Sequence, residues 1–163
     1  MQSLSFDLNA ASGDVNYSNN AASVGTNTYK FFVPKGTYYL TMKKSEGTGE
    51  YSFSMSLKGI TTTKVKAAKN LKGKKAKITW TKKSDVDGYQ VQVALNKKFT
   101  KSRKSKTLAV TKSYYSTKNP TSHTFTKLKK GKYYYARVRT YKLLNGKKYY
   151  SDWSSVKKFK VKK

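Results

Sequence analysis

Short segments in which apolar and polar residues alternate recur along the first part of the chain. In YSFSMSLK, at residues 51–58, aromatic and aliphatic residues alternate with serines and a lysine. A period of two is typical of a β-strand with one buried face. LSFDL near the start has the same period, while TYKFFV and TYYLTMKK flank the turn signal PKG. We therefore expect residues 1–60 to form a small antiparallel β unit.

The same alternation continues in residues 61–163. AKITW places Trp80 on one face with an alanine and an isoleucine, and YQVQVAL places Tyr89 on one face with two valines. TLAVTKS, SHTFTKL and VKKFKVKK are further candidate strands, and Asn145-Gly146 is a strong signal for a two-residue hairpin turn. About seven strands with turn signals every ~8–12 residues are typical of an antiparallel β-sandwich.

The segment YYYARVRTYKL allows two interpretations of its rings and cations. Tyr134 and Val138 fall on one face of a strand here, whereas Arg137, Arg139 and Tyr141 fall on the other. The segment could line a groove that tracks a nucleic-acid backbone, or its rings could fill a core while its cations face water. Because the alternation commits half of the rings to a core, we favour the second interpretation.

Charge divides the chain at a similar point. Residues 1–60 hold 5 lysines and 4 acidic residues, whereas residues 61–163 hold the other 31 of the 36 basic residues. The acids of the second part are Asp85, Asp87 and Asp152. This asymmetry predicts two units, residues 1–60 and 61–163. The formal net charge of +29 also creates a long-range positive field that attracts polyanions.

Composition excludes several kinds of site. The chain has no cysteine, which removes disulfides, thiolate metal sites and cysteine nucleophiles. No apolar run approaches the roughly 18 residues of a membrane span. His123 is the only histidine, and we expect it on the surface of a strand. The start, MQSLSFDLN, lacks the charged and apolar regions of a signal peptide.

The acidic residues form no convincing catalytic pair. DVDG at residues 85–88 begins like a calcium-binding loop but lacks its later ligands, so we interpret it as a turn. A calcium site at Asp7 and Asp14 is a minor alternative. No phosphate-cradling GxxxxGK[ST] motif occurs. We therefore expect a protein that is not an enzyme and that needs no metal or other cofactor.

Residues 64–163 resemble a fibronectin type III domain. Trp80 ends a strand as ITW, and Gly88-Tyr89 begins the next strand after TKKSDVD. LKKGKYY, at residues 128–134, matches the family's tyrosine corner, in which a tyrosine hydroxyl bonds back to the chain. The resemblance implies an all-β, Ig-like antiparallel sandwich. It also implies a structural core that includes Trp80, Tyr89, Leu128, Tyr134 and Val138.

Two further resemblances concern the origin of the chain. The lysine-rich style of KKFTKSRKSK resembles domains in surface and secreted proteins of Gram-positive bacteria. YKFFVPKGTYYLTMKKSEGTGEYSFSMSL resembles the last part of the bacterial pre-peptidase C-terminal domain, so residues 1–60 are expected to form a small or partial β-sandwich. Both resemblances imply an extracellular or cell-wall-associated protein. We expect its export signal to lie outside this chain.

The candidate binding residues are basic. Only Arg103, Arg137 and Arg139 are arginines, and base-specific reading of DNA relies on bidentate arginine, so we expect no specific nucleic-acid contact. The dense cluster KKFTKSRKSK is either a solvated loop or a polyanion-binding patch. LLNGKKYYSDW is either a second basic, aromatic binding loop or a plain hairpin. The predicted polyanion-binding residues are Lys97, Lys98, Lys101, Arg103, Lys104, Lys106, Lys147 and Lys148.

Three functions remain open at this point. The first is a non-catalytic extracellular module that attaches a bacterial protein to the cell surface by binding teichoic acid or another acidic polysaccharide. The second is a secreted fibronectin type III ligand of a protein receptor. The third is a nonspecific nucleic-acid binder. We favour the first function, and the sequence leaves the oligomeric state open.

Overall fold

The structure is a computed structural model that describes residues 4–10, 16–21, 37–44 and 59–162. The chain divides into two compact units, Met1–Met55 and Ser56–Lys163. Every regular element in the described residues is a β-strand, and all strand pairs are antiparallel. The fold class is therefore all-β, as the alternating pattern predicts.

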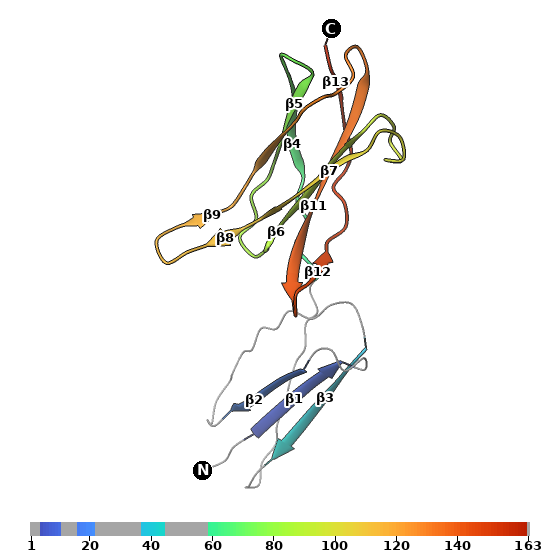
Figure 1. The fold of residues 1–163 in the computed structure, drawn as a ribbon. Helices are drawn as coiled ribbons and strands as arrows, with labels where there is room; N and C mark the ends of the chain where they lie inside the picture. Colours follow the sequence, from blue (N-terminus) through green and yellow to red (C-terminus); the bar gives the residue numbers. More distant parts are fainter. Residues whose placement is uncertain (1–3, 11–15, 22–36, 45–58, 163) are drawn as a thin grey trace. The chain divides into compact units, whose positions relative to one another are not determined.

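The first unit contains a three-stranded sheet with the order β2-β1-β3 (Figure 1). Its strands are β1 (Leu4–Ala10), β2 (Asn16–Ala21) and β3 (Tyr38–Lys44). Leu8 of β1 is buried and pairs with Leu40 of β3. LSFDL and TYYLTMKK thus form strands as expected. The predicted strands TYKFFV and YSFSMSLK lie outside the described residues.

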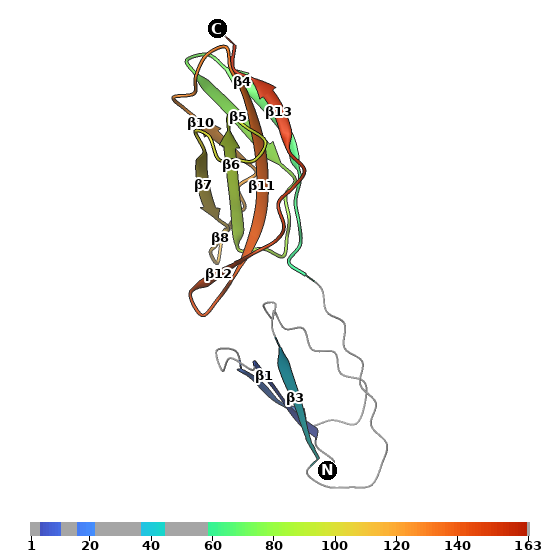
Figure 2. The same cartoon turned by 90° about the vertical axis from the view of Figure 1, so that its right-hand side faces the viewer.

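The second unit is a sandwich of two sheets (Figure 2). One sheet has the order β10-β5-β4. The other has the order β12-β11-β6-β7, and β13 also pairs with β11. The strands are β4 (Val65–Leu71), β5 (Lys75–Trp80), β6 (Gly88–Ala94), β7 (Lys104–Ala109), β10 (Ser122–Phe125), β11 (Tyr133–Leu144), β12 (Lys147–Tyr150) and β13 (Lys157–Lys160). A separate hairpin is made by β8 (Thr111–Lys112) and β9 (Thr117–Lys118).

The core lies between the two sheets and is built from the alternate positions of their strands. One sheet contributes Ile78 and Phe125, and the other contributes Val91 and Ala136. Rings fill much of the space, because aromatic side chains bury large areas in a chain that has few aliphatic residues. The five residues that the family resemblance places in the core all lie in this cluster: Trp80, Tyr89, Leu128, Tyr134 and Val138.

Two local structures form as their sequences suggest: the Asn145-Gly146 hairpin turn and the tyrosine corner at Tyr134. Asn145 and Gly146 have φ of 49° and 75°, and Leu144 pairs with Lys147 across them. The hydroxyl of Tyr134 accepts a hydrogen bond of 3.0 Å from the backbone N–H of Lys129, five residues upstream. The Tyr134 bond is the geometry of a tyrosine corner.

The sequence predicts the faces of β11 correctly, but one residue of the outer face is buried. Tyr141 lies on the outer face with Arg139, since both side chains contact the ring of Tyr150, yet it is only 2% exposed. Its ring packs over Gly88, where a built Cβ would lie 2.5 Å from the Tyr141 ring, and against Tyr150 of β12. Tyr141 is buried on this face because Tyr150 and the backbone at Gly88 lie against its ring.

Candidate polyanion-binding site

The antiparallel topology brings four segments of the second unit to one end of the sandwich. Tyr135 at the start of β11 pairs with Ala94 at the end of β6, so the connections before β11 and after β6 share an end. The β4–β5 turn and the end of β13 lie there too, because Leu71 pairs with Lys75 and Tyr133 pairs with Lys160. The C-terminus marks this end in Figures 1 and 2.

Hydrogen bonds tie these four segments together. The N–H of Leu128 donates to the carbonyl of Lys74 (2.9 Å), which joins the β10–β11 connection to the β4–β5 turn. The N–H of Gly131 donates to the carbonyl of Val161 (2.8 Å), which adds the C-terminal segment. The ammonium of Lys104 donates to the carbonyl of Thr126 (2.8 Å), which adds the start of β7. The end is thus one connected surface.

Every charged side chain that we assign to these four segments is basic and exposed. The acids of the second unit lie elsewhere: Asp85 pairs with Lys142, and the carboxylate of Asp87 accepts a bond from the N–H of Leu143 at the far end of β11. We call the surface the basic end. Its residues are Lys72, Lys74, Lys97, Lys98, Lys101, Arg103, Lys127, Lys129, Lys130, Lys132 and Lys162.

Only some of the polyanion-binding residues predicted from the sequence lie on the basic end. Lys97, Lys98, Lys101 and Arg103 lie in the β6–β7 connection and belong to the basic end. Lys104 begins β7 and is half-buried, with its ammonium held by the backbone, and Lys106 is exposed further along the same strand.

Lys147 and Lys148 are not part of this surface. They lie on β12, next to the Asn145-Gly146 turn and opposite Leu144 and Leu143. That turn lies at the other end of β11, so the structure separates these two lysines from the 97–106 cluster. Their ammonium groups lie over the rings of Tyr149 (5.4 Å) and Tyr141 (5.7 Å).

Sequence reasoning missed the other three segments of the basic end, which include the C-terminal segment with Lys162. Lys72 and Lys74 belong to the β4–β5 turn, and Lys127, Lys129 and Lys130 belong to the β10–β11 connection. The signal was present as the lysine-rich turns LKGKK and KLKKGK. Only the order of strands in the sandwich shows that these two turns meet the 97–103 loop at the same end.

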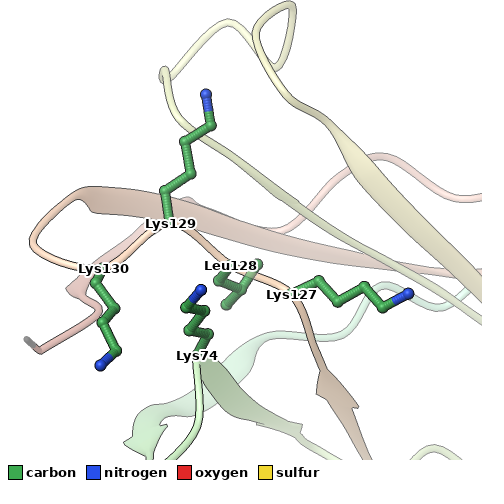
Figure 3. A pocket seen from close by; sticks show the side chains of 5 residues that line it. All are labelled: Lys74, Lys127, Leu128, Lys129 and Lys130. Atoms are coloured by element: carbon green, nitrogen blue, oxygen red, sulfur yellow. The ribbon is translucent and has the colours of Figure 1, made fainter.

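A shallow hollow of about 460 Å³ lies on the basic end and is lined by Lys74, Lys127, Leu128, Lys129 and Lys130 (Figure 3). In Figure 3 the side chains of Lys127, Lys129 and Lys130 point outward in different directions. Their cations do not converge on one point. This arrangement suits an extended chain of negative charges better than a single small anion, because a polymer can contact several dispersed cations.

A second cluster of cations lies on the outer face of β11 and was not foreseen from the sequence. The guanidinium of Arg137 lies between the rings of Phe99 and Trp153, 4.0 Å from each centre. The guanidinium of Arg139 lies between Tyr150 (3.8 Å) and Trp153 (4.3 Å). The result is a ladder of alternating rings and cations, in which each pair is stabilised by cation–π attraction.

Two glutamines of β6 accept hydrogen bonds from the arginines of this ladder. The side-chain carbonyl of Gln92 accepts bonds from Nε (3.0 Å) and Nη2 (2.9 Å) of Arg137, and that of Gln90 accepts from Nε of Arg139 (2.8 Å). Burial lowers the pKa of both arginines, and for Arg137 the nearby Arg139 and Arg103 lower the pKa further. These arginines are engaged within the domain, which argues against an open nucleic-acid groove along β11.

The structure also shows how the remaining candidates for chemistry are placed. His123 is half-buried rather than exposed, because its ring packs edge-on against the core residue Phe125 at 4.7 Å. Burial, and secondly the charge of Lys106, lowers its pKa. Within the described residues, no group of three or more histidines and acids lies close enough to hold a metal ion. Asp14 lies outside the described residues.

No described segment forms a helix that is long and apolar enough to cross a membrane.

Among solved structures, the chain resembles the FN1–FN3 domains of chicken CNTN1, with 15% identity and a TM-score of 0.49, over 99% of this chain and 54% of that one. It also resembles a structure described as a myokine, with 19% identity and a TM-score of 0.45, over 63% of this chain and 96% of that one. No curated protein matches. Residues 61–157 match the fibronectin type III domain, and the chain therefore belongs to the fibronectin type III family.

Proposed function

We propose that this chain is a non-catalytic extracellular module that binds an acidic polymer through the basic end of its fibronectin type III domain. The ligand is a teichoic acid or another acidic polysaccharide, and binding attaches a secreted protein to the surface of a Gram-positive bacterium. Residues 1–60 form a second, partial β module that resembles a pre-peptidase C-terminal domain. Fibronectin type III domains in general are protein-interaction modules of an extracellular type and are typically non-catalytic.

The segregation of charge carries this proposal. Four segments far apart in sequence meet at one end, and each contributes exposed cations and no acid. Like charges so close together repel one another, and the fold gains nothing in stability from gathering them. Such an arrangement is useful when a polyanion neutralises it. Lysine predominates over arginine, which favours a diffuse contact with repeated phosphates or carboxylates over bidentate recognition of one group.

Binding to purified Gram-positive cell walls tests this function. Walls with and without teichoic acid are mixed with the full chain across a salt series, beside a random DNA duplex. We expect retention at physiological salt that depends on teichoic acid and exceeds DNA binding. Equal binding to walls and DNA that disappears with salt would contradict a specific wall function, because any strongly basic protein behaves in that way.

A protein receptor is the second candidate partner. Membership of the fibronectin type III family favours it, since protein binding is the general role of such domains. Affinity for a protein partner that survives high salt would favour this function over attachment to a polyanion, because polyanion binding weakens steeply with salt.

A further inference from the structure

The β8–β9 hairpin stands apart from both sheets of the sandwich. β8 and β9 pair with each other as a separate two-stranded sheet, and Figure 1 shows the hairpin projecting sideways from the second unit. Every residue from Thr111 to Lys118 is exposed. The hairpin therefore adds nothing to the core, and the side chains at its tip are exposed to solvent.

Two tyrosines occupy the tip of this hairpin. Tyr114 is 95% exposed and Tyr115 is 92% exposed, and their rings meet edge to face with centres 5.0 Å apart. Adjacent exposed rings on a projecting tip are unfavourable in water and mark a contact surface. Exposed tyrosine is common at boundaries where one end of the ring is apolar and the other is wet.

The turn that carries the tyrosines is held by hydrogen bonds. The N–H of Ser113 donates to the carbonyl of Ser116 (2.8 Å), and the N–H of Ser116 donates to the hydroxyl of Ser113 (3.1 Å). The tip is thus formed before any partner arrives, so less conformational entropy is lost when it binds.

The charges around the tip indicate the kind of partner. Lys112 pairs with Thr117 and Lys118 with Thr111, so one lysine stands on each strand just behind the tyrosines. No acidic residue occurs between Asp87 and Asp152. A partner with negative charge around an apolar layer complements this arrangement. Lysine can lay its aliphatic stem along an apolar surface while its ammonium contacts phosphates.

We propose that the β8–β9 hairpin docks on an anionic lipid surface. Tyr114 and Tyr115 enter the headgroup layer, and Lys112 and Lys118 contact the lipid phosphates. This surface is distinct from the basic end, because Ala109, which precedes the hairpin, pairs with Gly88 at the opposite end of β6. A pocket on a protein is the competing occupant, but the pair of flanking lysines favours a lipid surface.

Vesicle binding tests the proposal with the full chain. Sedimentation compares phosphatidylcholine vesicles with vesicles in which about a third of the lipid is phosphatidylserine. The test variant is Tyr114→Ser with Tyr115→Ser. The matched control is Tyr39→Ser with Tyr133→Ser, which removes two other tyrosines that are at least half exposed. Thermal unfolding verifies that each variant is folded.

We expect the unchanged chain and the control to bind the anionic vesicles, and the hairpin variant to bind at least about tenfold more weakly. A Tyr115→Trp variant should add a blue-shifted emission that brominated lipids quench. Equal binding by the hairpin variant and the control would overturn the proposal, since charge alone would then explain adsorption. Absence of vesicle binding would also overturn it and would leave a protein pocket as the occupant of the tip.

Discussion

The guanidinium of Arg137 lies 4.0 Å from the centre of the Trp153 ring. The guanidinium of Arg139 also lies over the Trp153 ring, 4.3 Å from its centre. Trp153 therefore packs against two cations on the outer face of β11, in a segment that the N–H groups of Ser151 and Ser154 also bond to β11. The basic residues of this domain thus form two different arrangements: arginines packed between rings on the outer face of β11, and exposed cations at the basic end.

Replacing Trp153 with alanine should lower the free energy of unfolding by about 2 kcal/mol, because two cation–π contacts and a half-buried ring are lost. Urea unfolding followed by circular dichroism measures the change. Tyr114→Ala is the control, since Tyr114 is almost fully exposed and its loss should leave stability unchanged. Similar stabilities for the two variants would show that the ladder does not hold the fold.

Tyr134→Phe should lower the free energy of unfolding by about 1–2 kcal/mol, because the N–H of Lys129 loses its acceptor. Tyr133→Phe, at the preceding position, keeps the ring under the ammonium of Lys158 and should be neutral. Equilibrium urea unfolding compares the two. If both substitutions are neutral, the tyrosine corner does not stabilise this domain.

The sequence allowed the strands and the core to be predicted more fully than the site. Alternation identifies a strand wherever one face is buried, so Trp80 and Val138 were assigned to the core before their neighbours were known. Alternation assigned Tyr141 to the outer face correctly, but it could not show that Tyr150 and the backbone at Gly88 bury the ring there. The separation of Lys97 from Lys148 could not be predicted from their shared basic character, since it depends on which ends of antiparallel strands meet.

The ladder could not be predicted for a related reason. Arg137 and Arg139 are two residues apart on one strand, as are Gln90 and Gln92, so a shared face was visible in the sequence. Trp153 lies in a segment without regular structure, and no periodicity indicates that it folds back over the arginines. A segment without regular structure shows no hydrophobic periodicity in the sequence, so its contacts cannot be predicted from such a pattern.

Gly88→Ala should lower the free energy of unfolding by about 3 kcal/mol, at the upper end of the cost of overpacking a core. A Cβ at Gly88 would lie 2.3 Å from the carbonyl oxygen of Leu108 and 2.5 Å from the Tyr141 ring. Gly59→Ala is the control, because a Cβ there meets nothing within 4 Å. Thermal unfolding should show a large loss only at Gly88, and equal midpoints would contradict this packing.

Stability should fall in mild acid because of His123. Its pKa in the folded domain lies below the ordinary value of 6.5, so the unfolded chain takes up a proton first as the pH falls. The loss begins as the pH drops through about 6.5 and is complete below the folded pKa. His123→Gln should flatten the dependence of the unfolding midpoint on pH in this window. An unchanged slope in the variant would assign the dependence to another group.

The most direct test of the central claim compares two variants of equal net charge. One replaces four lysines around the hollow of the basic end with glutamine: Lys74, Lys127, Lys129 and Lys130. The other replaces four exposed lysines toward the opposite end: Lys64, Lys82, Lys147 and Lys148. Affinity for purified teichoic acid is measured for both across a salt series. Exposed ion pairs contribute about 0.2–1 kcal/mol each, so the basic-end variant should bind teichoic acid about tenfold more weakly. Its affinity should also depend less steeply on salt. The affinity of the other variant should change about twofold at most. Equal losses in the two variants would show that net charge, and not the basic end, governs binding.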